Sequence, residues 1–344
     1  MKKSLLALAV LGTFAGAASA QSSVTIYGIV DTGVAHIDNG GDTLNALKSG
    51  SNSSSRIGFK GVEDLGSGLK ATFVLENGIN SDDGTAADDT AAFSRLSYVG
   101  LQGGFGSVLL GKQNTQIKTA LSQIDPFGTG GMANAITYFG GTAAGTIPER
   151  VANQITYTTP DMGGFNGSLG YTFGEVAGDT SAKSAWGAQL GYVNGPLDVQ
   201  FGYNDADQST TTGVKQSDTK IALIGTTYDF GVLKLHGAYG QKKLDSDTTA
   251  PDIKVKSALI GVTVPFGANA IRAEYIRNND DRSDYDNSVW ALSYTYSLSK
   301  RTTLYATYAS VDNDDNSALG FGSSPTVVAG ETTSEFAVGI QHNF

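Results

Sequence analysis

Apolar and polar residues alternate along most of the chain after residue 22, with the two-residue period of a β-strand. The last segment is the clearest case, because every second side chain is large and the side chains between are mostly small or polar. The positions on its mostly apolar side are Phe336, Val338, Ile340, His342 and Phe344. Helical spacing is almost absent. The pattern therefore predicts a chain of strands, each about long enough to cross a membrane.

The connections between these segments are of two kinds, which take turns along the chain. Seven are short and rich in turn residues, at residues 65–68, 102–106, 160–164, 194–195, 229–231, 265–269 and 299–301. Eight are long and polar, at residues 38–50, 79–92, 114–149, 175–183, 204–216, 243–254, 278–287 and 312–332. This alternation predicts sixteen strands, with both chain termini on the side of the short turns.

Two architectures fit many amphipathic strands: a β-sandwich or solenoid, and a closed transmembrane barrel. A sandwich mixes short and long connections at both ends, whereas an outer-membrane barrel keeps its short turns at one end. Aromatic residues near expected strand ends are also typical of membrane interfaces; they are Tyr27, Phe165, Tyr171, Tyr192, Phe230 and Phe344. Closure pairs every backbone group, as hydrocarbon demands. We expect an all-β fold, a 16-stranded antiparallel transmembrane β-barrel.

Composition supports an ordered protein in an unusual environment. The 344 residues include 45 glycines and no cysteine, and only 16% are charged, against about 25% in a typical soluble domain. A chain without cysteine has no disulfide framework and no thiolate metal site. No apolar run reaches the roughly 18 residues that a membrane-spanning helix requires, so a helical membrane protein is excluded.

The N-terminus has the features of an export signal. Two lysines precede an apolar stretch at residues 5–14 that is too short to span a membrane, and a small-residue cleavage site ends at Ala20. We predict a signal peptide over residues 1–20 and a single-domain barrel over residues 21–344. A buried N-terminal helix is the alternative, but this stretch has no polar face and contains helix-weakening glycines.

The charge balance excludes one class of partner. Removing the predicted signal peptide takes away two lysines and no acid, which leaves 21 basic and 33 acidic residues and a net charge of −12. Nucleic-acid binding depends on neutralising phosphates with basic side chains. We therefore expect no nucleic acid among the partners of this chain.

Several blocks of the sequence resemble general porins of β-proteobacteria. They are residues 22–28 (SSVTIYG), 55–71 (SRIGFKGVEDLGSGLKA), 94–101 (SRLSYVGL) and 150–157 (RVANQITY). The resemblance runs from the N-terminus to Phe344 and implies a sixteen-stranded homotrimer in the lipid of the Gram-negative outer membrane. It also implies that Phe344 is a signal read by the barrel-assembly machinery. The alternation by itself says only that Phe344 faces lipid.

The longest predicted loop, residues 114–149, is the third long loop of the pattern. Loops of this length are normally functional or disordered. In the porins that this chain resembles, the corresponding loop folds into the barrel and narrows the pore. Paired glycines such as Gly130 and Gly131 would then let the backbone pack closely against the barrel wall. The alternative is an extracellular loop outside the channel.

Strand parity selects the charged side chains that face the lumen. With Ile57 and Phe59 toward lipid, Arg56 and Lys60 face inward. An arginine on the lipid face would cost about 2–4 kcal/mol at the bilayer midplane, so the inward placement also has an energetic basis.

The same parity argument takes Leu96 and Tyr98 as lipid-facing and Arg95 as inward, and it places Arg150 inward on a later strand. By resemblance, Arg56, Arg95 and Arg150 match the positions of a basic constriction cluster in the family. The alternative is that these arginines merely pair with carboxylates inside a wide channel.

Two carboxylates complete the predicted constriction, and one cation stays unassigned. Glu76, together with Asp125 if the long loop folds inward, would supply an acidic wall opposite the arginines. Where the family usually has Gly-Arg-Gln after the fifth strand, this chain has Gly111, Lys112 and Gln113. The parity of this segment does not place Lys112 securely.

The expected function is a water-filled channel for passive diffusion of small hydrophilic solutes and ions, with a preference for anions. The alternatives are a substrate-specific channel, for phosphate or dicarboxylates, and an outer-membrane barrel enzyme. Only His36, His236 and His342 could serve as histidine bases, and none lies in a nucleophile motif. Acidic clusters such as residues 280–286 lack the spacing of a calcium loop. We therefore predict no catalytic residue, no cofactor and no metal.

Overall fold

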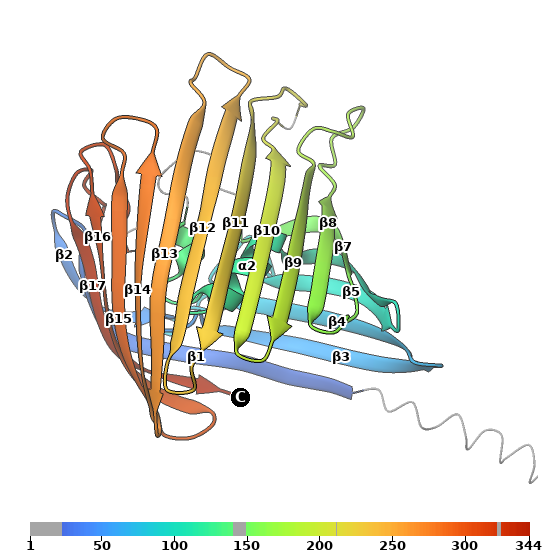
Figure 1. Ribbon diagram of the computed structural model, residues 1–344, viewed down its shortest axis with the longest axis horizontal. Helices are drawn as coiled ribbons and strands as arrows, with labels where there is room; N and C mark the ends of the chain where they lie inside the picture. The colour runs from blue at the N-terminus through green and yellow to red at the C-terminus, as the bar shows by residue number, and fades with distance from the viewer. Residues whose placement is uncertain (1–22, 140–148, 211, 322–324) are drawn as a thin grey trace, which may run out of the picture.

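The computed structural model describes residues 23–139, 149–210, 212–321 and 325–344. These residues form a single antiparallel sheet that closes into a barrel, with two short helices inside it (Figure 1). The predicted signal peptide, residues 1–20, lies outside the described residues and stays a prediction. No helix among the described residues is long and apolar enough to cross a bilayer.

Seventeen strands and two helices are labelled along the described chain. The strands are β1 (Ser23–Asp38), β2 (Thr43–Ser49), β3 (Arg56–Gly66), β4 (Leu69–Gly78), β5 (Leu96–Gly103), β6 (Gly106–Asn114), β7 (Arg150–Thr158), β8 (Phe165–Thr172), β9 (Ala185–Asn194), β10 (Leu197–Asp207), β11 (Ser217–Asp229), β12 (Lys234–Ser246), β13 (Ile253–Phe266), β14 (Asn269–Asp280), β15 (Asn287–Ser297), β16 (Thr302–Asn313) and β17 (Thr333–Asn343). The helices are α2 (Gln116–Ile124) and α3 (Ala135–Tyr138).

The seventeen strands make sixteen crossings of the barrel, because β2 and β3 share one of them. Both pair with β1, β2 along residues 32–38 and β3 along residues 23–29, so they lie end to end. β17 pairs with the other edge of β1 and closes the barrel. The predicted 16-stranded antiparallel fold is confirmed. The predicted long loop at residues 38–50 is wrong, because most of it forms β2 and the strand is interrupted later, at residues 50–55.

The connections alternate as the pattern predicts. All seven predicted short turns join consecutive strands at one end of the barrel, and the long connections lie at the other end. Between β9 and β10 the turn residue Gly195 has a positive φ of 56°, a conformation that glycine adopts without steric cost.

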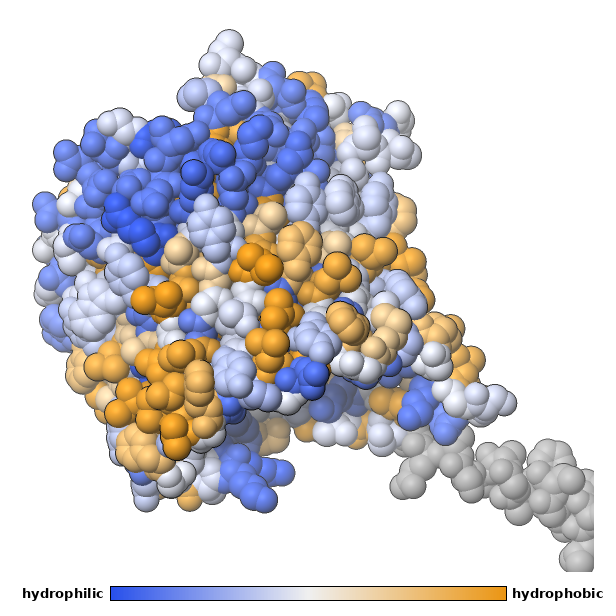
Figure 2. Space-filling model, viewed as in Figure 1, coloured by the Kyte–Doolittle hydropathy of each residue, from blue (hydrophilic) through white to orange (hydrophobic). Residues whose placement is uncertain are grey.

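The outer face of the barrel is apolar across its middle. In neighbouring strands Leu190, Phe201, Ile224 and Tyr239 lie side by side in register, and all four side chains are exposed. Figure 2 shows hydrophobic surface across the strands and hydrophilic surface at the end with the long loops. An apolar outer face between polar ends is what a membrane-spanning barrel requires.

The main hydrophobic core lies inside the barrel, where residues 115–139 of the third long loop pack against the inner wall. Helix α2 turns one apolar stripe toward β10, β11 and β12, and Ile117, Leu121 and Ile124 on this stripe are fully buried. The wall offers small residues there: a Cβ atom at Gly202 or Gly225 would press against the helix side chains. The predicted inward fold of the third long loop is confirmed.

Both ends of α2 are anchored to the wall by hydrogen bonds. At its N-terminus the backbone N–H of Ile117 donates to Oδ1 of Asn204 on β10, at 2.8 Å. At its C-terminus Nδ1 of His236 on β12 donates to the carbonyl of Ile124, at 2.6 Å. These partners satisfy helix-end groups that would otherwise be buried unpaired, so the helix has one fixed orientation in the lumen.

We expect the substitution Leu121→Ala to loosen the loop from the wall, since removing a fully buried leucine costs about 2–5 kcal/mol. Limited proteolysis of the folded protein should show faster cleavage within residues 114–149. The matched control is Leu190→Ala on the outer face, which should leave the cleavage rate unchanged. Equal cleavage rates in the two variants would contradict the packing described.

Candidate functional site

A cavity of roughly 430 Å³ lies between the infolded loop and the wall around β3–β7, and its lining is strongly basic. The cationic side chains in the lining are Arg56, Arg95, Lys118, Arg150 and Arg272. Glu76 is the one carboxylate among the lining residues that the structure describes. We call this space the cationic cavity. The residues that line this cavity carry a net positive charge, although the protein as a whole has a net charge of −10.

Arg56 begins β3 and is positioned by the interruption that precedes it. Its Nε donates to the carbonyl of Ser54 and its Nη2 to Oγ of Ser53, both at 3.0 Å. The backbone of this segment is held by the fully buried Asp31, whose Oδ2 accepts from the N–H of Ser53 at 2.6 Å. The hydroxyl of Tyr305 donates to the other oxygen of Asp31 at 2.7 Å. A buried carboxylate thus fixes the turn that presents Arg56 to the lumen.

Arg95 and Glu76 form an ion pair on one wall of the cavity, with Nε and Oε1 2.7 Å apart. The hydroxyl of Tyr27 donates to Oε2 of Glu76 at 2.8 Å. Tyr27, which we expected at a membrane interface, therefore faces the lumen. The prediction that Glu76 stands on a wall opposite the arginines is wrong, since it lies on β4, directly between Gly58 of β3 and Leu96 of β5.

Arg95 lines the lumen as predicted, but not because of the strand parity that the prediction assumed. Leu96 and Tyr98 share the face of Glu76 and line cavities in the lumen, so the lipid-facing parity assumed for them is wrong. The outward residues of β5 are Val99 and Leu101, which are 57% and 44% exposed. Arg95 precedes the strand and reaches inward from the loop.

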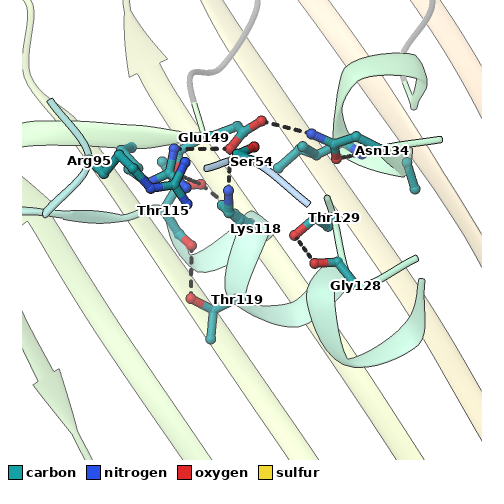
Figure 3. A network of polar contacts seen from close by, with 12 residues as sticks. Ser54, Arg95, Thr115, Lys118, Thr119, Gly128, Thr129, Asn134 and Glu149 are labelled. Atoms are coloured by element: carbon teal, nitrogen blue, oxygen red, sulfur yellow. Dashed lines mark hydrogen bonds and ion pairs between the residues drawn. The ribbon is translucent and has the colours of Figure 1, made fainter. Parts of the chain in front are cut away.

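Arg150 and Lys118 share the carboxylate of Glu149 at the junction of loop and wall. Figure 3 shows Lys118 and Asn134 on either side of Glu149. Nη1 of Arg150 lies 3.2 Å from Oε2 of Glu149, and Nζ of Lys118 contacts the same oxygen. Asn134, the N-cap residue of α3, donates from Nδ2 to Oε1 of Glu149 at 3.0 Å. Glu149 therefore ties α2, α3 and β7 together and offsets part of the positive charge.

Asp125 does not face the arginines, which corrects the prediction made for it. Its side chain is buried, 5% exposed, and turned into its own loop. Oδ1 accepts from the N–H of Phe127 at 2.7 Å, and Oδ2 accepts from the N–H groups of Thr129 and Ala135 at 2.8 and 3.1 Å. The carboxylate stabilises the turn after α2, and it adds no charge to the lining of the cationic cavity.

Lys60 and Lys112 both lie away from the cationic cavity. Lys60 faces the lumen as predicted, but it is exposed, with Nζ 5.0 Å from the centre of the Tyr27 ring, and it does not line the cavity. Lys112 pairs with Ser97, on the face of Val99, so the structure places it on the outer side of the barrel. Lys112 has no place in the constriction.

Sequence reasoning missed two cations of the lining. Lys118 sits on α2, in a segment read as a loop, where no strand parity applied. Arg272 lies on β14 across the lumen, where its Nη2 donates to Oδ1 of Asn52 at 2.6 Å and its guanidinium lies 4.9 Å from the Phe127 ring centre. The alternation with Ile271 and Ala273 would have placed Arg272 inward.

Phe344 lies where the pattern predicts, on the outer face, with 41% of its surface exposed. Its backbone exchanges hydrogen bonds with Gly28 on β1, at 3.1 and 3.2 Å, and so extends the seam that closes the barrel. Its role as an assembly signal stays a prediction.

The three histidines of the described chain lie on the outer face and on the wall beside α2. No group of three or more histidine, aspartate or glutamate side chains among these residues is placed to hold a metal ion. His36 and His342 lie on the outer face, in register with Phe336 and Val30. His236 is occupied in anchoring α2.

We expect the charge of the cationic cavity to depend on pH above neutrality through Lys118. Burial lowers the pKa of Lys118 to about 8, against the opposing attraction of Glu149. The amine is therefore charged below about pH 8 and neutral above it, so any preference for anions should weaken between about pH 7 and about pH 9. Reversal potentials in a salt gradient measure this.

The matched control is Lys118→Arg, because a guanidinium keeps its charge throughout this range. The arginine variant should show a flat pH profile where the wild type declines. An equal decline in both proteins would assign the titration to another group.

Comparisons with known proteins agree on one family. The chain matches the family model described as Gram-negative porin over residues 7–316. It is 40% identical to outer membrane porin protein 32 of Delftia acidovorans, over 100% of both chains. It is 33% identical to an outer membrane porin protein of Bordetella pertussis, over 94% of this chain and 99% of that one.

The chain is also similar to solved structures of outer-membrane proteins. The chain is similar to an anion-selective porin from Comamonas acidovorans, with a TM-score of 0.83 and 35% identity, over 94% of this chain and 100% of that one. The trimer form of OmpT from Vibrio cholerae has a TM-score of 0.67 and 17% identity, over 94% of this chain and 99% of that one, a likeness of fold alone.

Proposed function

Because this chain belongs to the Gram-negative porin family, we propose that its barrel admits small hydrophilic solutes and ions by passive diffusion, with a preference for anions. The chain is a general porin of the outer membrane and a channel rather than an enzyme. What we propose beyond family membership is the preference for anions. The observation that carries it is the lining of the cationic cavity, with five cationic side chains and one carboxylate among its described residues.

The hydrogen-bond partners of these cations leave much of the charge uncompensated. Glu76 pairs with Arg95, and Glu149 is divided between Arg150 and Lys118. The side chains of Arg56 and Arg272 donate only to neutral groups, the Ser53, Ser54, Asn52 and Ser293 oxygens. The carboxyl groups of Asp125 and Glu274 act on Arg272, and that of Glu76 acts on Arg56, without forming an ion pair with either. Guanidinium groups keep their charge at neutral pH, and these two supply a positive field in the lumen.

Distance and screening favour the constriction over the acidic loops outside. The Debye length is about 8 Å at physiological salt, so exposed carboxylates such as those of Asp82 and Asp83 act mainly at the mouth. Charges at the narrowest point of a pore act on each ion that passes. The similarity to a porin described as anion-selective points in the same direction.

We expect the triple variant Arg56→Gln, Arg95→Gln, Arg150→Gln to lose most of the anion preference, since it removes three of the five cations of the cavity. The measurement is the zero-current potential of purified protein in a planar bilayer under a potassium chloride gradient. Arg301→Gln, in the exposed turn before β16, is the single-charge control and should leave the potential unchanged. A cation-preferring wild type, or a triple variant with the wild-type potential, would reject the proposed preference.

We also propose that the chain works as a homotrimer, that residues 1–20 are removed on export, and that the barrel-assembly machinery reads Phe344. A neighbour of similar fold has been solved in a trimer form. The apolar outer face can contact lipid or a second barrel.

If the homotrimer is correct, detergent-solubilised protein inserted into a bilayer should add conductance in groups of three equal sublevels. Cross-linked species of the purified protein should stop at three chains. Single, independent conductance steps together with a monomeric mass would contradict a stable trimer.

A further inference from the structure

A second cavity, of roughly 460 Å³, adjoins the cationic cavity and has a different chemistry. The two cavities share Leu96 and Asn114 in their linings. The second is lined by seven amide side chains and four serine or threonine hydroxyls, with Asp198 as the one charged group among its described lining residues. We call it the amide cavity. It lines the lumen near the short turns, since Asp198 and Val193 flank the β9–β10 turn.

Helix α2 divides the two cavities because its residues fall into three faces. At about 100° per residue, Ile117, Leu121 and Ile124 form the stripe that packs on the wall. Lys118 and Ser122, four residues apart, line the cationic cavity. The third face, which lines the amide cavity, carries Gln116, Thr119 and Gln123. One nine-residue helix thus presents a cation to one side and uncharged hydrogen-bonding groups to the other.

The wall of the amide cavity is held by a chain of amide hydrogen bonds. Nε2 of Gln189 donates to Oδ1 of Asn166 at 2.9 Å and to Oε1 of Gln200 at 2.8 Å. Nε2 of Gln200 donates to Oδ1 of Asp198 at 2.6 Å. Gln189 and Gln200 are 5% and 2% exposed. Such a network fixes the direction of each donor and acceptor before a solute arrives.

Several polar groups of this cavity lack a protein partner. Gln116 is 2% exposed, and its Oε1 accepts no hydrogen bond within the described structure. Oδ1 of Asn114 is likewise buried and accepts no hydrogen bond from the described residues. The hydroxyl of Tyr98 also makes no hydrogen bond among the described residues, although it lines the cavity. Buried polar atoms are normally paired. Because the two amide oxygens are themselves buried, the hydroxyl of Tyr98 is the group of these three that a molecule in the cavity can reach.

We propose that the amide cavity is a binding subsite for uncharged, polyhydroxylated solutes of about the size of a monosaccharide. The inference rests on the proposed function, since it requires solutes to diffuse through the lumen. The volume of the amide cavity falls within the roughly 300–1,000 Å³ typical of small-molecule sites.

The chemistry of the lining selects this class. An amide group offers both donors and acceptors, as a sugar hydroxyl does. Leu96, Leu109 and Tyr98 supply an apolar surface that fits the carbon face of a sugar ring. The lining has no cation among its described residues, and the carboxylate of Asp198 disfavours anions. Anions are therefore drawn to the cationic cavity, and neutral solutes have a place beside it.

The test is the block of chloride current through the purified porin by D-glucose in a planar bilayer. We expect the wild type to lose current in a saturable manner as glucose rises. Tyr98→Phe and Gln123→Ala each remove one cavity-facing group that makes no hydrogen bond in the described structure, so the barrel should fold normally. Each variant should raise the half-blocking concentration about two- to tenfold, the loss expected for one hydrogen bond.

Gln241→Ala is the matched control, because Gln241 lies on the outer row of β12 and lines neither cavity. It should block like the wild type. A linear, unsaturated loss of current, or half-blocking concentrations equal to that of the wild type in both cavity variants, would overturn the subsite. The zero-current potential in potassium chloride should be unchanged in both variants, so failure of the anion preference would be seen separately from failure of this subsite.

Discussion

The burial of one short amphipathic helix against the inner wall of the barrel is the interaction on which the rest of the structure depends. Without this helix, the lumen of so wide a barrel would be filled with water. β10–β12 make room for the helix by presenting glycine and alanine to Ile117, Leu121 and Ile124. Each fully buried side chain of this size contributes about 1.5–3 kcal/mol. Because Asn204 and His236 hold the helix ends, the same packing that narrows the lumen also fixes which helix face each cavity receives.

A second constraint acts on the opposite side of the lumen. The interruption between β2 and β3 carries backbone N–H groups inward, and the buried carboxylate of Asp31 accepts two of them. The segment so held bonds to Arg56 on one side and, through Asn52, to Arg272 on the other. Arg56 and Arg272, which form no ion pair among the described residues, are thereby kept close to the infolded loop. Loop packing and a buried acid together produce a lumen with one cationic region and one region lined mostly by uncharged amide and hydroxyl groups.

Local pattern predicted the candidate site in part. Arg56 and Arg150 lie in strands with a two-residue period, so their inward direction follows from their neighbours. Asp125 was misplaced because a carboxylate in a loop has no periodicity, and this one accepts hydrogen bonds from backbone N–H groups two to ten residues further along the chain. Leu96 was misread because an apolar residue at the lumen surface looks like a lipid-facing one. Lys118 could not be placed until the helix that carries it was seen.

The sequence by itself determined the sixteen crossings, the seven short turns and the apolar outer face, because each follows from alternation within a few neighbouring residues and from the lipid that the outer face must meet. Only the tertiary structure decided which carboxylates pair with which arginines, how the third long loop lies on the wall, and where the lumen divides. Those features depend on contacts between residues far apart in the chain, such as Arg272 with Asn52 and Ile117 with Asn204. The alternation of neighbouring residues does not encode these long-range contacts, because they form only when the barrel closes.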